Sequence, residues 1–125
     1  MNRIIPTALN VHKVSKALSL QYGSGESYRL KAEYLRVLSP SAEVRGHGSP
    51  VLQIGKLNVG IIEAEVIGSY AIKLSFDDGH DSGIYSWDYL YDLCLNQDLH
   101  WASYTQKMHE AGASRDPAIS IVRLF

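Results

Sequence analysis

The chain has 125 residues, of which 46% are hydrophobic and 20% are charged. This is the composition of a globular protein, and the length predicts a single domain over residues 1–125. The 12 basic and 13 acidic side chains give a net charge of −1, which argues against non-specific binding of nucleic acid. No apolar run approaches the ~20 residues that a membrane span needs, so we expect no membrane insertion.

Cysteine usage bears on the compartment. Cys94 is the only cysteine, so neither an internal disulfide nor a cysteine-rich zinc framework can form. The first ten residues lack the apolar core and the small-residue cleavage site of a secretory signal. We therefore expect a cytoplasmic protein.

The first half of the chain predicts one hairpin and one short helix. Residues 1–10 are expected to form a leading arm, since Pro6 disfavours regular structure. Alternating apolar residues predict a hairpin over residues 18–30. Residues 33–38 predict a short helix that stops before Pro40. Residues 39–58 are rich in Gly, Pro and Ser and predict an irregular loop, with a short helix at 42–45 as an option.

A second hairpin is predicted over residues 61–76, with a turn at Gly68-Ser69. Its first strand carries three apolar side chains on one face, those of Ile62, Ala64 and Val66. The apolar face of its second strand carries Tyr70, Ile72, Leu74 and Phe76. Polar residues occupy the opposite faces, which is typical of an antiparallel sheet with one face in water.

The last third of the chain predicts helix. Ser86 is a good N-cap, and Gly112 is a natural stop. An apolar stripe between them favours one long helix, or two nearly collinear helices with a break near residues 96–97; the stripe consists of Trp87, Leu90, Tyr91, Cys94, Trp101, Tyr104 and Met108. Residues 118–125 are too apolar for a solvated tail, so they should pack back or dock elsewhere. The predicted fold class is α+β: a small antiparallel sheet of two hairpins, with a short helix and a long C-terminal helix packed on it.

Enzyme motifs are absent from the sequence. There is no P-loop, and Gly23-Ser24-Gly25 lacks the third glycine and the βαβ context of a dinucleotide fingerprint. A non-haem iron triad needs an acid two residues after a histidine, but Asp81 follows His80 directly. We therefore predict a non-catalytic protein.

Two segments combine charged residues and histidines with turn glycines: residues 33–47 and residues 76–90. The simplest interpretation is structural. Aspartates in the second segment would cap backbone amides between a strand and a helix, and an arginine–carboxylate pair would hold the loop of the first.

The same segments carry a resemblance to a known family. Leu35-Arg36, the run Ser39 to His47 and the run Phe76 to Trp87 resemble the gamma-butyrobetaine hydroxylase-like N-terminal domain family, over residues 10–95. In the hydroxylases this domain precedes an iron- and 2-oxoglutarate-dependent oxygenase domain, binds zinc through three cysteines and a histidine, and helps subunits associate. The family also occurs fused to P-loop ATPases that carry iron–sulfur clusters. This chain has neither the signature of the oxygenase domain nor that of the P-loop ATPase, so we do not expect it to have their activities.

The resemblance implies that the zinc ligands are altered here. The three cysteine positions are Ser39, Ser41 and Val44, and only the histidine has a counterpart, His80. Serine and valine are not zinc ligands, so the Cys₃His site cannot form. If the two loops meet, as the resemblance implies, zinc or iron could instead be bound by two histidines and a carboxylate; the candidates are His80, His47, Asp78 and Glu43, with Asp77 and Asp81 as other carboxylates. Alternatively, the loops are held without metal, with Arg36 and Arg45 as donors.

We expect a binding or accessory module for a protein partner, which the resemblance places in iron–sulfur assembly or oxygenase-type metabolism. Its candidate surface surrounds the two loops and includes Arg36, Arg45, Asp77, Asp81, Tyr85 and Trp87, with Tyr85 and Tyr89 as exposed aromatic residues. One alternative is a metal-free domain that forms homodimers. Another is an enzyme subunit in which His80 and the nearby aspartates relay protons.

Overall fold

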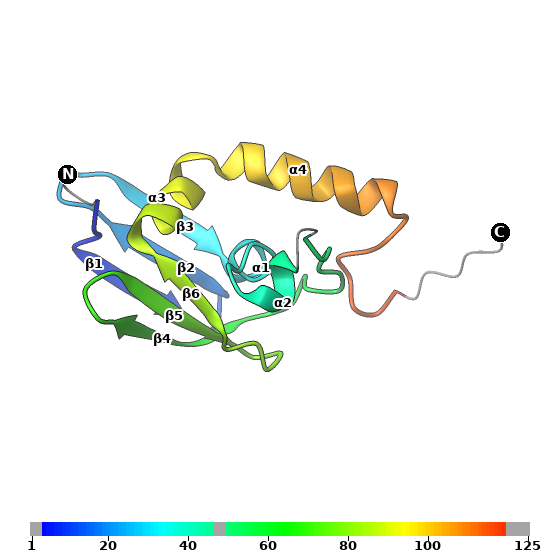
Figure 1. The fold of residues 1–125 in the computed structure, drawn as a ribbon, viewed down its shortest axis with the longest axis horizontal. Helices are drawn as coiled ribbons and strands as arrows, with labels where there is room; N and C mark the ends of the chain where they lie inside the picture. Colours follow the sequence, from blue (N-terminus) through cyan, green and yellow to red (C-terminus); the bar gives the residue numbers. More distant parts are fainter. Residues whose placement is uncertain (1–3, 47–49, 120–125) are drawn as a thin grey trace.

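The computed structural model describes residues 4–46 and 50–119 of the chain. These residues form two three-stranded antiparallel sheets and four helices, which confirms the α+β class (Figure 1). The helix nearest the C-terminus runs along one side of the molecule, over the two short helices of the middle segment (Figure 1). None of the described helices is both long and apolar enough to cross a membrane.

The first sheet has the order β1-β2-β3 and comprises β1 (Ala8–His12), β2 (Ala17–Gln21) and β3 (Ser27–Lys31). The hairpin predicted over 18–30 is confirmed as β2 and β3. The expectation that residues 1–10 form only an arm is wrong. Leu9 and Val11 alternate after Pro6 and pair with Leu20 and Leu18 of β2, so the strand starts beyond the proline and loses no ladder hydrogen bond to it.

The second sheet has the order β4-β5-β6 and comprises β4 (Ile61–Ile67), β5 (Ala71–Phe76) and β6 (Gly83–Ser86). The inward face of β5 is confirmed for Ile72, Leu74 and Phe76, which are buried. Tyr70 differs from its prediction, because it lies in the turn before β5 and is half exposed.

Strand β4 differs from its predicted pattern at Ile62 and at Val66, which is 63% exposed although it pairs with the buried Ile72. The register shifts between Ile61 and Glu63, which marks a bulge. An extra residue in one strand reverses the alternation of faces. Ile61 is therefore buried at 3% exposure, whereas Ile62, predicted to share the inner face, is 53% exposed.

Four helices complete the fold: α1 (Ala32–Val37), α2 (Ala42–Arg45), α3 (Trp87–Leu95) and α4 (Gln97–Glu110). Ser86 caps α3 as predicted, since its side chain accepts a hydrogen bond from the Tyr89 amide. The C-terminal helix is interrupted at Asn96, whose backbone is not helical, so the predicted break near residues 96–97 is confirmed. Gly112 follows α4 with a φ of 61°, the left-handed conformation usual after a helix end.

One hydrophobic core joins both sheets to α1 and α3. Its fully buried side chains include Leu18, Leu20, Leu30, Leu35, Ile72, Leu74, Tyr85, Leu90 and Leu93. A smaller cluster of Val37, Tyr104 and Met108 attaches α4 to α1. Helix α4 is thus part of the packed domain.

The segment after α4 also packs back on the domain. The amides of Gly55 and Leu57 donate to the carbonyls of Ser114 and Arg115. The Arg115 guanidinium makes two hydrogen bonds of 2.7 Å to the buried carboxylate of Glu33 in α1. Ile119 is half exposed, and the rest of the apolar tail predicted to dock, residues 120–125, lies outside the described residues.

The bulge in β4 leads to a prediction about stability. Ile61→Ala should lower the free energy of unfolding by about 2–4 kcal/mol, because it empties a core position. Ile62→Ala, one residue along, should change it by about 0.5 kcal/mol or less. Urea unfolding of both variants beside wild type measures the difference, and equal losses would contradict the assigned register.

Candidate functional site

His80 lies at the centre of the two segments that the sequence singled out. It follows the turn after β5, where the positive φ of 89° at Gly79 reverses the chain. The His80 carbonyl accepts from the Phe76 amide at 2.8 Å, and the His80 amide donates to Asp78 Oδ1 at 3.2 Å. These bonds turn the side chain inward, and the residue is buried.

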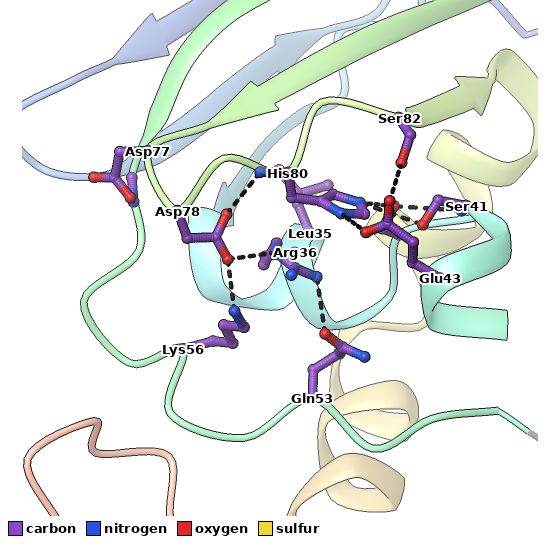
Figure 2. Close-up of polar contacts among 12 residues, drawn as sticks. Leu35, Arg36, Ser41, Glu43, Gln53, Lys56, Asp77, Asp78, His80 and Ser82 are labelled. Carbon is purple, nitrogen blue, oxygen red and sulfur yellow. Dashed lines mark hydrogen bonds and ion pairs between the residues drawn. The ribbon is translucent and has the colours of Figure 1, made fainter. Parts of the chain in front are cut away.

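The His80 ring is bound to the loop between α1 and α2 (Figure 2). Its Nε2 lies 2.8 Å from Ser39 Oγ and 3.3 Å from Ser41 Oγ. Its Nδ1 lies 3.2 Å from Glu43 Oε2. A carboxylate only accepts, so Nδ1 donates to Glu43, and in the neutral ring Nε2 accepts from the serine hydroxyls. Both ring nitrogens are therefore engaged.

The two loops also interlock sterically. A Cβ atom at Gly83 would come within 2.5 Å of Ser39 Oγ, so only glycine allows the start of β6 to approach this close. Ser39 itself is 1% exposed. The serine hydroxyl is thus enclosed between the His80 ring and the β6 backbone.

Asp78 connects a third segment to the same site. Its Oδ2 lies 2.8 Å from Arg36 Nε and 2.6 Å from Lys56 Nζ (Figure 2). Arg36 Nη1 donates in turn to Gln53 Oε1 at 3.1 Å. Helix α1, the turn after β5 and the irregular segment 53–56 are thereby tied together by one partly buried network.

The electrostatics of Asp78 follow from these contacts. Partial burial by itself would raise the pKa of the carboxyl, but the hydrogen bonds from Lys56 and Arg36 outweigh it. The pKa of Asp78 falls from 3.8 to about 2. The network is therefore charged throughout the neutral range.

Other predicted site residues lie apart from the His80 ring. Asp77 points away from it (Figure 2) and accepts from the Gly60 amide at 3.0 Å. Asp81 is exposed, and Arg45 lies over the Tyr89 ring, 5.1 Å from its centroid.

Two aromatic residues differ from their expected place. Tyr85, expected at the surface, is fully buried, and its hydroxyl donates to the Leu35 carbonyl. Trp87 is buried as well and donates to the Ser69 carbonyl at 2.9 Å. Both lie on the inward face of the β6–α3 junction, so they are core residues and offer no surface to a partner.

A groove lies on the other side of Ser39, between the loop after α1, helix α2, residues 50–52 and helix α4. Its volume is about 390 Å³. The side chains that line it include Val44, Arg45, Val51, Leu52, Tyr104 and Lys107. Ser39 borders both the groove and the His80 cluster, so the cluster fixes one wall of the groove.

Ser39, His80 and Glu43 stand in the order of a nucleophile, a base and an orienting acid. Sequence analysis missed this arrangement, because it treated the serines only as replaced zinc ligands. The geometry does not suit acyl transfer, however. The hydroxyl is enclosed against Gly83, which leaves no place for a carbonyl about 3 Å from it. The three residues act as a hydrogen-bonded link between loops.

Comparison with known proteins assigns the fold to a family. Residues 9–91 match the family described as "Gamma-butyrobetaine hydroxylase-like, N-terminal". The chain belongs to this family. None of the curated proteins compared with the chain is similar enough to be a relative.

Three solved structures resemble the family member described here. Two are solution NMR structures. The first protein is 58% identical in sequence, and the match covers 99% of this chain and 99% of that one with a TM-score of 0.85. The second is 46% identical, and the match covers 99% of this chain and 94% of that one with a TM-score of 0.78. The third is a crystal structure of a DUF971 family protein of unknown function from Acidithiobacillus ferrooxidans. It has 33% identity and a TM-score of 0.60, over 70% of this chain and 90% of that one. The first two matches extend beyond residue 91, so helix α4 is shared with those proteins.

Family membership allows the zinc site to be tested against the residues present. Ser39, Ser41 and His80 do converge, as the family resemblance implies, but hydroxyls replace the thiolates. These residues do not fit a Cys₃His zinc site.

The alternative ligand set is only partly brought together. Glu43 reaches the His80 ring, whereas the Asp78 side chain is directed at Arg36 and Lys56. His47 lies outside the described residues. Within residues 4–46 and 50–119, no group of three or more His, Cys, Asp or Glu is placed to bind a metal ion.

Asp78 gives a prediction with a defined pH dependence. Because its pKa is lower when folded than the ordinary 3.8, it stabilises the fold above about pH 4, and this stabilisation is lost as the pH falls toward 2. Asp78→Asn should therefore lower the free energy of unfolding by about 2 kcal/mol at neutral pH. The difference in this free energy between the variant and wild type should become smaller below about pH 4.

Urea unfolding at several pH values measures this gap. Asp81→Asn is the matched control, since it removes an exposed carboxylate from the same turn and should change stability little. A gap between Asp78→Asn and wild type that stays constant down to pH 2 would show that the Arg36 and Lys56 contacts do not stabilise the charged carboxylate.

Proposed function

We propose that this protein is a non-catalytic module that binds another protein through the face formed by the loops around Ser39 and helix α4. The observation that carries the proposal is the contrast between the His80 cluster and its neighbouring groove. Both His80 ring nitrogens and the Asp78 carboxylate are engaged by other protein groups. The groove beside them is open and apolar, which is typical of a binding site.

In this proposal His80 is a positioning residue. Ser39 and Ser41 belong to the loop that leads into α2, and α2 supplies Val44 and Arg45 to the groove. Fixing that loop with hydrogen bonds, without a metal, sets the width of the groove before a partner arrives. A preformed site loses less conformational entropy on binding.

The family resemblance suggests where to look for the partner. Proteins of iron–sulfur assembly and of oxygenase-type metabolism are the first candidates for reconstitution. The main alternative is a homodimer formed through the same face, which predicts a partner of the same mass as the chain.

Site-specific photo-crosslinking tests the proposal. A benzophenone amino acid placed at Val51, which is half exposed at the groove, should give a discrete crosslinked product in cells of the source organism. The same group at Glu63, exposed on β4 and absent from the groove lining, is the control and should give none.

Mass spectrometry of the product then identifies the partner. A product containing a second polypeptide supports the proposal, and a product containing two copies of this chain supports the homodimer. No product at Val51, or the same products at both positions, would contradict a binding face here.

A further inference from the structure

The groove differs from an ordinary apolar surface depression in its charge. Arg45 on α2 and Lys107 on α4 contribute to its two sides, and both are exposed. Among the residues that the structure describes, neither forms an ion pair with a carboxylate. No aspartate or glutamate belongs to the described lining.

The histidine of the lining already has a carboxylate partner. His100 Nε2 lies 2.9 Å from Asp92 Oδ2. The positive charge available to a ligand therefore comes from Arg45 and Lys107. This distribution is notable in a chain whose net charge is −1, because it concentrates positive charge where the surface is hollow.

The groove has an apolar part that can accept an apolar side chain. Val44 and Tyr104 are buried beneath it, while Val51 is half exposed at its edge. The volume of about 390 Å³ is at the lower end of the range of ligand pockets, about 300–1,000 Å³.

Two contacts hold the wall that carries Arg45. The Tyr89 hydroxyl donates to the Leu38 carbonyl at 2.6 Å, and the Arg45 guanidinium lies on the Tyr89 ring. A cation over an aromatic face keeps its charge and its outward hydrogen-bonding capacity while losing freedom. Arg45 is thus held ready for an anionic group.

From these observations we infer that the groove binds an acidic segment of the partner protein, which inserts one apolar side chain and places carboxylates against Arg45 and Lys107. The inference rests on the proposed function and specifies the partner's chemistry. Charge complementarity selects the acidic segment, since a basic or neutral one would leave both cations uncompensated.

A random 12-residue peptide library displayed on phage and selected against the full chain tests this inference. The enriched peptides should carry aspartate or glutamate beside a leucine, isoleucine or phenylalanine. Amide chemical-shift changes in the ¹⁵N-labelled protein should map the synthesised peptides to residues 50–52 and to the α4 residues of the groove.

The affinity of the selected peptides for charge-reversal variants tests the role of the two cations quantitatively. Lys107→Glu and Arg45→Glu should each weaken peptide binding about tenfold or more, and rising salt should weaken binding to wild type. Lys13→Glu makes the same change of net charge in the β1–β2 turn, outside the groove lining, and should leave the affinity unchanged.

The outcomes separate this inference from the proposed function. Acidic, apolar peptides that map to the groove and respond to Lys107→Glu support both. Peptides that map to the groove without acidic residues, or that bind Lys107→Glu normally, overturn the inferred chemistry and leave the binding face intact. Enrichment of no peptide, or of peptides that bind another face, overturns the inference, and the crosslinking result at Val51 then decides the proposed function independently.

Discussion

The hydrogen bonds of the His80 ring are the constraint on which the rest of the site depends. They join the loop after α1 and the first turn of α2 to the turn after β5. Each buried donor or acceptor left without its partner would cost about 1–3 kcal/mol. The cluster is therefore stable as a unit, and it is sensitive to the loss of any of its inner members.

The cluster occupies the place of the zinc site that the family resemblance implies. A metal and a histidine-centred hydrogen-bond network can hold loops in the same arrangement, but they do so differently. Thiolate ligands bind metal only when deprotonated, which makes the link dependent on metal supply and pH. Serine hydroxyls around an imidazole form their link without a metal. The flanking Asp78 network, with its charged Arg36 and Lys56 partners, adds a second tie between the same segments.

The His80 cluster affects function by fixing the position of the residues that line the groove. Ser39 is shared by the cluster and the groove, so the residues beyond it, including Val44 and Arg45, stand where the cluster places them. Helix α4 closes the other side through Tyr104, which packs on Val37 of α1. Arg115 and Glu33 hold the chain after α4 against the same helix. The core, the cluster and the C-terminal segment are thus connected around the groove.

Much of this arrangement follows from sequence patterns. The alternation in β2, β3 and β5, the Ser86 cap and the break at Asn96 are local signals, and local signals are readable. The burial of Ile61 and the exposure of Ile62 could not be predicted, because a bulge leaves no compositional mark in β4. Strand β1 was not predicted, because the effect of Pro6 was extended to all of residues 1–10. The alternation of Leu9 and Val11 after the proline indicates the strand.

At the site, the sequence identified His80, Asp78 and Glu43 as neighbours only through the family resemblance. The resemblance also implied that Ser39 lies near His80, 41 residues away, but only as a replaced zinc ligand; it gave no signal for the hydrogen bond that joins them. Tyr85 shows the converse. Strand alternation, applied to β6, would have placed it inward beside Gly83, whereas aromatic character alone suggested a surface contact.

Native mass spectrometry with elemental analysis of the tag-free protein, before and after chelation, tests the central claim most directly. If hydrogen bonds alone join the two loops, the mass will be that of the polypeptide, and the thermal melt will not change when chelator is added. One equivalent of zinc or iron that is lost in His80→Ala would contradict the account, because it would show that a metal still links the loops.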